Sequence, residues 1–159
     1  MQFQLLAERE EFIPVIARWY FDQWGHLNDD ATVGKIVAEM EIYTNHDSIP
    51  LIVLATEGSD LLGVAQLKYH EMKIYPDKEH WLGGVYVARE HRGRGIASLA
   101  ANKIADIARD LGVKKLHLQT ERLDGGLYAR LGWRPLEQVN YRGLDVLVME
   151  RGLNNQPAP

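Results

Sequence analysis

The sequence predicts a mixed α/β fold, with a mostly antiparallel sheet of about seven strands and about four helices. Two observations lead to this prediction. Three short apolar segments separated by turn residues precede a long amphipathic segment, an order typical of antiparallel strands followed by a helix. A strand pattern at 79–88 then leads through a glycine turn to a helix pattern at 96–111 and a further strand pattern at 114–120. Because strand–helix–strand units form right-handed parallel crossovers, these two strands should be parallel, and the sheet can splay between them.

The N-terminal third is predicted to hold one strand and two helices. Residues 2–7 alternate enough for a strand, and the acidic cluster Glu8–Glu11 favours a helix start. This helix should run to Trp24, and one of the polar residues 28–30 should cap a second helix that ends within 40–43. The predicted apolar faces are Ile13, Ile16, Ala17 and Tyr20 in the first helix, and Val33, Ile36, Val37 and Met40 in the second.

The remaining strands follow from short apolar runs bounded by turn residues. Residues 49–56 and 61–71 should form a hairpin that leads into the strand at 79–88. After the crossover, a short helix should end at Leu131 and Gly132, and the segments 133–141 and 144–149 should form a last hairpin. The long helix is predicted to bury Ile96, Leu99, Ala100, Ile104, Ile107, Ala108 and Leu111.

Length and composition set the class of protein. The 159 residues predict one domain, 1–153, with a flexible C-terminal tail at 154–159. The absence of cysteine excludes a disulfide framework, a thiolate metal site and a cysteine nucleophile. The formal net charge of −4 argues against nucleic acid as a partner.

Membrane, metal and hydrolase functions are also not expected. There is neither an apolar run long enough to span a membrane nor a basic leader, so we expect no membrane partner and a cytoplasmic location. The six histidines lack metal-ligand spacing, so no metal is expected. The sequence contains neither a Gly-x-Ser-x-Gly motif nor a phosphate-binding Gly-Lys-Ser/Thr motif.

The turn before the long helix has the character of an anion site. Gly93 and Gly95 let backbone N–H groups approach a ligand, and the helix that follows offers its unpaired N–H groups and positive dipole end. Arg89, Arg92 and Arg94 surround this turn in an otherwise acidic chain, which points to phosphate groups. The simpler alternative is a glycine turn with solvated arginines.

The same segment resembles the GNAT family of N-acetyltransferases. Arg92-Gly93-Arg94-Gly95-Ile96-Ala97 fits that family's Arg/Gln-x-x-Gly-x-Gly/Ala signature, 116–120 resembles its fifth strand, and 127–133 resembles its Tyr-x-x-Leu-Gly-Phe helix end. The resemblance covers residues 50–150 well. It implies acetyl-CoA as the co-substrate, held by Val85, Tyr86, Val87, Arg92, Gly93, Arg94, Gly95, Ile96, Ala97 and Ser98.

The implied reaction is acetyl transfer to a primary amine of a small molecule, peptide or protein, by direct attack without a covalent enzyme intermediate. A backbone N–H within 85–87 would polarise the thioester carbonyl. Tyr128 stands at the position of the family's general acid, which would protonate the departing thiolate. Its alternative role is that of a packing tyrosine. Many members of the family form homodimers, so the resemblance also implies a homodimer as one expected assembly.

The general base is less defined by the sequence. Many family members carry a glutamate in the fourth strand, whereas this chain has 81–84, Trp-Leu-Gly-Gly, in that region. Glu79 or His80, just upstream, is the predicted base. His70 and Glu71 on the neighbouring strand are alternatives, as is solvent water.

The acceptor site is predicted from aromatic and acidic residues. Trp24 and His26, near the end of the first helix, lie where the family builds its acceptor pocket, although a packing role is an alternative. Glu121 and Asp124 stand where relatives often have asparagine and a small residue, and their charge would attract an ammonium group. The alternative for both acids is a solvated loop.

Two rival functions share parts of this sequence pattern. A dinucleotide-binding enzyme also begins with a strand, a Gly-x-Gly and a helix, but Ser98 replaces the third glycine and only one crossover is predicted. A non-catalytic acyl-CoA-binding regulatory module would keep the glycine loop without needing an acid. Tyr128 beside an open acceptor cleft distinguishes the enzyme from that module.

Overall fold

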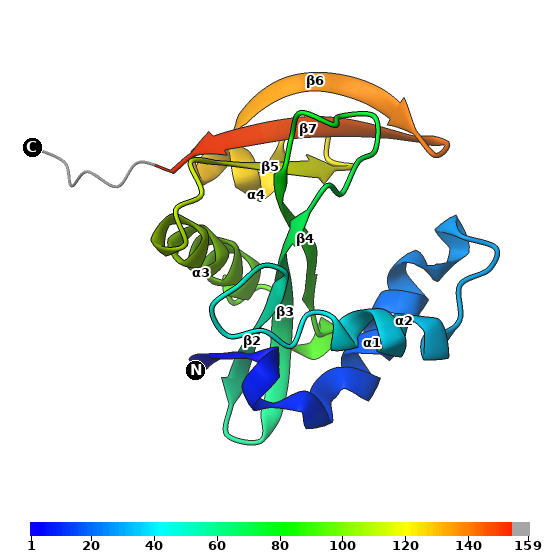
Figure 1. Ribbon diagram of the computed structural model, residues 1–159, viewed down its shortest axis with the longest axis vertical. Helices are drawn as coiled ribbons and strands as arrows, with labels where there is room; N and C mark the ends of the chain where they lie inside the picture. Colours follow the sequence, from blue (N-terminus) through cyan, green and yellow to red (C-terminus); the bar gives the residue numbers. More distant parts are fainter. Residues whose placement is uncertain (154–159) are drawn as a thin grey trace, which may run out of the picture.

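One mixed sheet organises the molecule. The computed structural model describes residues 1–153, so the predicted tail at 154–159 lies outside the described residues. Seven strands pair in the order β1-β2-β3-β4-β5-β7-β6, and every neighbouring pair is antiparallel except β4 with β5, as predicted (Figure 1). The strands are β1 (Gln2–Leu5), β2 (Leu51–Glu57), β3 (Asp60–Tyr69), β4 (His80–Val87), β5 (Lys115–Thr120), β6 (Arg134–Tyr141) and β7 (Leu144–Gly152).

Four α-helices accompany the sheet in the part of the chain that the structure describes. They are α1 (Ile13–Trp24), α2 (Val33–Glu41), α3 (Ile96–Asp110) and α4 (Gly126–Arg130). Short 3₁₀ turns occupy Leu6–Glu8, Glu10–Phe12, Gly25–Leu27 and Arg89–His91. The predicted fold class is therefore confirmed. None of these helices is long and apolar enough to cross a lipid bilayer.

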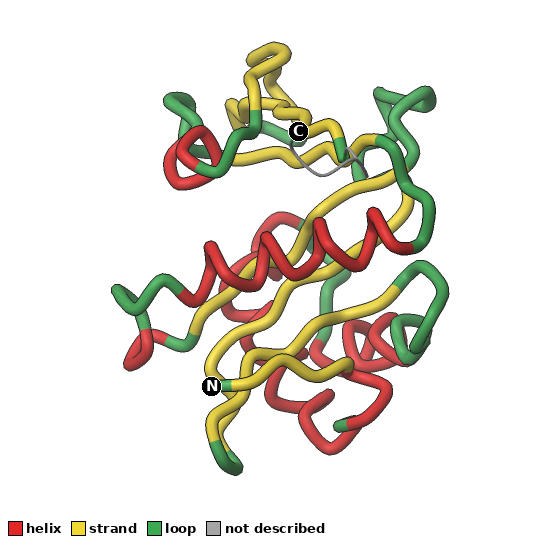
Figure 2. Tube along the Cα trace, turned by 90° about the vertical axis from the view of Figure 1, so that its left-hand side faces the viewer, coloured by secondary structure: helices red, strands yellow, loops and turns green. Residues whose placement is uncertain are grey.

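Helices cover both faces of the sheet. Figure 2 shows α3 running across one face, while α1 and α2 lie on the other. Within β2, Leu51 and Val53 join the core under α3, whereas Ile52 and Leu54 join the core under α1 and α2. This strand is covered on both sides, and it therefore reads as a continuous apolar run rather than an alternating one.

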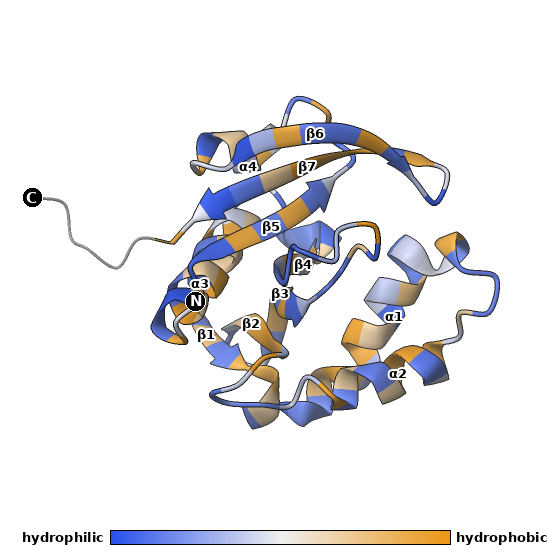
Figure 3. Cartoon of the chain, turned by 45° about the horizontal axis from the view of Figure 1, so that its top comes forward, coloured by the Kyte–Doolittle hydropathy of each residue, from blue (hydrophilic) through white to orange (hydrophobic). Residues whose placement is uncertain are grey.

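The second half of the sheet is closed by a loop. The segment between β3 and β4 extends toward β5 and β7 (Figure 1). It carries Met72, which packs with Trp81 of β4 and with Val146 and Val148 of β7, all buried. Strand β6 lies at the sheet edge, and exposed polar residues separate its half-buried Leu136, Val139 and Tyr141 (Figure 3), as expected for a strand with one solvated face.

The buried face of α3 agrees with the prediction at Ile96, Ala100, Ile104 and Ala108, but not at the two leucines. Leu99 and Leu111, expected in the core, are 45% and 37% exposed, whereas Ala101 and Ala105 are fully buried. Alanines on this face allow the helix backbone to approach the sheet closely, and the apolar stripe is therefore rotated toward the small residues. Hydrophobic spacing alone favoured the larger leucines, and this part of the prediction was wrong.

The start of α2 also differs from the prediction. Thr32, rather than a residue within 28–30, is the N-cap, and its Oγ1 accepts a hydrogen bond of 3.1 Å from the N–H of Lys35. Asn28 instead stabilises a local turn, since its Oδ1 accepts from the N–H of Asp30. Met40 is the only residue of the predicted α2 stripe that is fully buried; the others are half-buried against the same core.

Candidate active site

The sheet opens between its two parallel strands. Within residues 1–153, β4 and β5 share one backbone pair, Trp81 with His117, and the strands diverge beyond it. The pairing of β4 with β3 is also interrupted, because the register shifts between Val64 and Gln66. The C-terminal half of β4 therefore presents an unpaired edge toward β5, and backbone groups on such an edge are available to a ligand.

Gly84 makes the irregularity in β4 possible. Its φ of +54° lies in the left-handed region, which favours glycine. A Cβ at this position would lie 2.6 Å from Gln66 Cδ and 2.7 Å from the Tyr20 hydroxyl, so no side chain fits. The Tyr20 hydroxyl donates a 2.7 Å hydrogen bond to the Gly84 carbonyl and so ties α1 to the bulge.

The backbone N–H of Val87 faces the opening. Ala88 donates its N–H to the Leu62 carbonyl on β3, and Val87 pairs with Gly63. Val87 thus occupies a non-hydrogen-bonded pair, in which its own N–H and C=O point away from β3 and toward β5. This places one backbone donor of the predicted segment 85–87 on the open edge.

The glycine loop leads from β4 into α3. Gly93 and Gly95 have φ values of +84° and +77°, and Gly95 is the N-cap of α3. No side chain caps the helix, and the first helical bond runs from Leu99 N–H to the Gly95 carbonyl. The N–H groups of the first turn, in 96–98, precede that bond and point out of the helix end, where an anion can accept from them.

The three arginines near this loop have different surroundings. Arg92 donates from Nε to the Val87 carbonyl at 2.9 Å, and its guanidinium lies 5.3 Å from the centre of the Tyr86 ring. Arg94 forms an ion pair of 3.0 Å with Glu57. Arg89 is exposed in the preceding 3₁₀ turn. Arg92 is therefore the cation that the fold attaches most directly to the end of β4.

Tyr128 projects from the short helix α4. This helix begins after Gly125, whose φ is +84°, and Asp124 supports the turn by accepting from the Gly126 N–H at 2.9 Å. The Tyr128 ring meets that of Trp133 edge to face, with 6.2 Å between centroids. Burial, and secondarily the negative charge of Glu71, raises the pKa of Tyr128 to about 12. The hydroxyl consequently keeps its proton at neutral pH.

Glu71 spans the space between β3, β4 and β5. Its Oε1 lies 3.7 Å from Lys68 Nζ, and its Oε2 accepts from Gln119 Nε2 of β5 at 3.3 Å. A Cβ at Gly83 would lie 2.5 Å from Oε1, so the carboxylate fills the room that the missing β4 side chain leaves. Burial raises the pKa of Glu71 despite the opposing charge of Lys68.

The raised pKa of Glu71 should make the free energy of unfolding depend on pH. Because the folded-state pKa of Glu71 is raised above its ordinary 4.5, the folded protein loses stability as pH rises through that shifted range. Glu71→Gln should therefore raise Tm relative to the wild type at pH 8, and this gain should vanish below pH 4.5. Thermal unfolding across pH tests this expectation, with Glu10→Gln, at an exposed glutamate, as the control. An equal Tm difference at all pH values would contradict it.

The predicted bases Glu79 and His80 lie at the beginning of β4. They contact each other at 3.3 Å, with the Glu79 side chain 58% exposed, and the His80 ring lies 5.4 Å from that of Tyr69. Their contacts are therefore with each other and with the β3–β4 hairpin. The negative charge of Glu71 contributes to the raised pKa of Tyr128.

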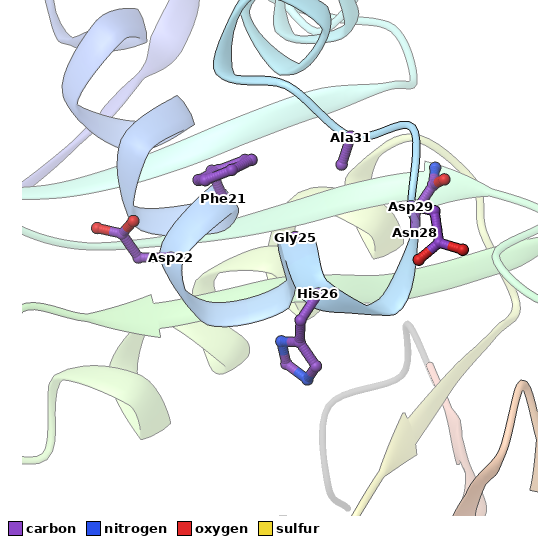
Figure 4. A pocket seen from close by; sticks show the side chains of 7 residues that line it. All are labelled: Phe21, Asp22, Gly25, His26, Asn28, Asp29 and Ala31. Atoms are coloured by element: carbon purple, nitrogen blue, oxygen red, sulfur yellow. The ribbon is translucent and has the colours of Figure 1, made fainter.

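The two predicted acceptor residues near the end of α1, Trp24 and His26, have different surroundings. The rings of Trp19 and Trp24 lie 5.1 and 6.4 Å from that of Tyr86, so the end of α1 covers this part of β4. His26 is exposed and lines a pocket of about 440 Å³ between the end of α1 and the segment before α2 (Figure 4). The other residues that line it are Phe21, Asp22, Gly25, Asn28, Asp29 and Ala31.

Glu121 and Asp124 lie in the loop between β5 and α4. Glu121 is exposed. Asp124 accepts from the Gly126 N–H and pairs with Arg122 at 3.2 Å, and these two partners, in that order, hold its pKa below the usual range. Both oxygens of Asp124 are thus engaged locally, which gives this side chain a part in shaping the start of α4.

The fold is that of solved acetyltransferases. The chain is similar to YncA from Salmonella typhimurium, which was solved with its cofactor acetyl-CoA, at 19% identity and a TM-score of 0.76. The match covers 99% of this chain and 96% of YncA. A ribosomal-protein-alanine N-acetyltransferase from Brucella melitensis matches at 18% identity, with a TM-score of 0.77 over 96% and 100% of the two chains. An aminoglycoside 6'-N-acetyltransferase complexed with coenzyme A matches at 14% identity, with a TM-score of 0.76 over 99% and 100%.

The family follows from the sequence match. Residues 10–133 match the model of the acetyltransferase (GNAT) family, and the chain belongs to this family. No curated protein matches the chain.

Proposed function

We propose that this protein transfers an acetyl group from acetyl-CoA to a primary amine. The observation that carries the proposal is a continuous path from the open edge of β4, through the Val87 N–H, to the glycine loop and the uncapped start of α3. A pantetheine arm can pair with the strand edge while the pyrophosphate binds the N–H groups of 96–98. That all seven strands join one sheet supports treating 1–153 as the catalytic domain.

The proposed reaction needs an oxyanion donor and an acid. The nitrogen lone pair of the amine attacks the thioester carbonyl carbon, and a backbone N–H of the open edge within 85–87 stabilises the charge that develops on the carbonyl oxygen. The C–S bond then breaks, and Tyr128 gives its proton to the CoA sulfur. The proton on the newly bonded nitrogen returns to the Tyr128 oxygen, so no covalent enzyme intermediate is required.

The proposed acceptor is a cationic amine. The pocket beside α1 carries the carboxylates of Asp22 and Asp29, which favour an ammonium group, although Arg18 pairs with Asp22 at 3.2 Å. The similar solved structures include proteins named for aminoglycosides and for a ribosomal protein, so both a small amine and a peptide α-amine are supported as acceptor classes.

Release of CoA thiol tests this function. The purified protein is incubated with acetyl-CoA and, separately, with polyamines, aminoglycosides and short peptides, and free thiol is measured together with the mass of the acceptor. The proposal predicts thiol release matched by a gain of one acetyl group on at least one acceptor. Acetyl-CoA binding with no transfer to any of these amines would instead favour the non-catalytic regulatory module.

Arg92→Ala should raise the KM for acetyl-CoA about 10- to 100-fold with little change in kcat. Loss of a charged hydrogen bond costs ~1.5–3 kcal/mol, and each 1.4 kcal/mol is tenfold in affinity. Steady-state kinetics at varied acetyl-CoA measure the effect. Arg109→Ala is the matched control, because it removes the same charge from the last turn of α3. Equal KM values for the two variants would contradict the role of Arg92.

A further inference from the structure

We propose that Glu71 is the general base that accepts the proton of the acceptor amine, an inference that rests on the proposed acetyl transfer. The sequence predicts Glu79 or His80 as the base, with His70, Glu71 and water as alternatives, because β4 itself has glycines in place of a carboxylate. In the folded protein the carboxylate comes instead from the segment after β3. It lies against Gly83, at the point where β4 separates from β5.

Three neighbouring elements fix the position of this carboxylate. Lys68 of β3 faces Oε1, Gln119 of β5 donates to Oε2, and Gly83 of β4 leaves the room that the group occupies. The side chain is only 16% exposed, so its orientation is set by these contacts rather than by solvent. A carboxylate held on both oxygens at the opening of the sheet is preorganised to accept a proton there.

The Glu71 carboxylate and the Tyr128 hydroxyl act on the same site from different elements. The charged or titratable groups that face Glu71 are Lys68 from β3, Tyr43 from the end of α2 and Tyr128 from α4. Burial raises the pKa of Glu71 and so makes it a stronger proton acceptor than an exposed glutamate. The same burial keeps Tyr128 protonated, and the two groups are therefore matched as base and acid.

The proton balance assigns one step to each group. The acceptor enters as an ammonium ion, and Glu71 removes one proton, which leaves the neutral amine with a free lone pair. After attack, Tyr128 gives its proton to the departing CoA sulfur and receives the proton of the newly bonded nitrogen. The proton on Glu71 passes to solvent at the end of the cycle, so each turnover releases one proton together with the amide and free CoA.

The pH dependence of kcat/KM, measured with one acceptor for the wild type and for variants, tests this assignment. Glu71→Gln should lower kcat about 100-fold or more and abolish the fall in activity on the acidic side, while the Kd for acetyl-CoA stays unchanged. Glu71→Asp should keep part of the activity and the acidic limb. Glu10→Gln, at an exposed site in the N-terminal turn, should match the wild type.

Other outcomes would overturn the assignment. A Glu71→Gln enzyme with kcat within threefold of the wild type and an intact acidic limb would exclude Glu71 as the base. Loss of that limb in Glu79→Gln, with the limb kept in Glu71→Gln, would return the role to the start of β4. A wild-type protein that acetylates none of the amines would refute the proposed function itself, and the role of Glu71 with it.

Discussion

Replacement of Tyr128 by phenylalanine should lower kcat about 100-fold or more while acetyl-CoA still binds with unchanged affinity. The change removes one hydroxyl and keeps the ring that packs against Trp133, so α4 should remain in place. A general acid contributes roughly 10²–10⁴ to the rate, and the variant would have to expel CoA as an unprotonated thiolate. Steady-state kinetics and calorimetric titration of acetyl-CoA measure the two effects separately.

Tyr141→Phe is the matched control for Tyr128→Phe. Tyr141 is the last residue of β6, the edge strand that β5 and β7 separate from β4. Loss of its hydroxyl should therefore leave kcat unchanged. Because the pKa of Tyr128 is raised to about 12, the wild type should also show no loss of activity from deprotonation of this group up to pH 10. A Tyr128→Phe enzyme with kcat within threefold of the wild type would assign this tyrosine to packing.

Gly84→Ala should be the most destabilising small substitution at the site. A left-handed backbone conformation costs an alanine about 1–2 kcal/mol. The new Cβ would also meet Gln66 Cδ at 2.6 Å and the Tyr20 hydroxyl at 2.7 Å, so side chains on β3 and α1 must move. We expect a total loss of at least ~3 kcal/mol, which lowers Tm by about 6–12 °C in a protein of this size.

Gly143→Ala separates backbone strain from contact. Gly143 has a φ of +84°, but nothing lies within 4 Å of a Cβ there, so this variant should show only the strain of about 1–2 kcal/mol. Thermal unfolding followed by circular dichroism compares the two variants. An equal loss of Tm in both would show that the Tyr20 and Gln66 contacts at Gly84 carry no energy.

Local hydrophobic patterns made much of the fold predictable from the sequence. The strand, the glycine loop and the long helix have distinct periodicities, and the handedness rule for crossovers fixed the parallel pair. The face of α3 was predictable only in part, because close approach to the sheet also buries Ala101 and Ala105, whereas periodicity favours Leu99. The N-cap of α2 was also not predictable, because Asn28 forms a local turn with Asp30 and the helix begins only after Thr32.

The proposed site was predictable only in part for the same reason. The cofactor loop and Tyr128 lie in contiguous motifs. Glu71 acquires its position from long-range contacts with Gln119 and with the space at Gly83, and neither is adjacent to it in the sequence. The sequence nevertheless holds a signal for this position. The paired glycines Gly83 and Gly84 in β4, a strand without a carboxylate, leave room for a carboxylate from a neighbouring element.

Calorimetric titration with acetyl-CoA, with NADH as the control ligand, tests the central claim most directly. We expect saturable binding of one acetyl-CoA per chain, weaker binding by Arg92→Ala and no binding of NADH. Absence of heat with acetyl-CoA, or equal binding of NADH, would contradict an acyl-CoA site at the open edge of β4 and the start of α3.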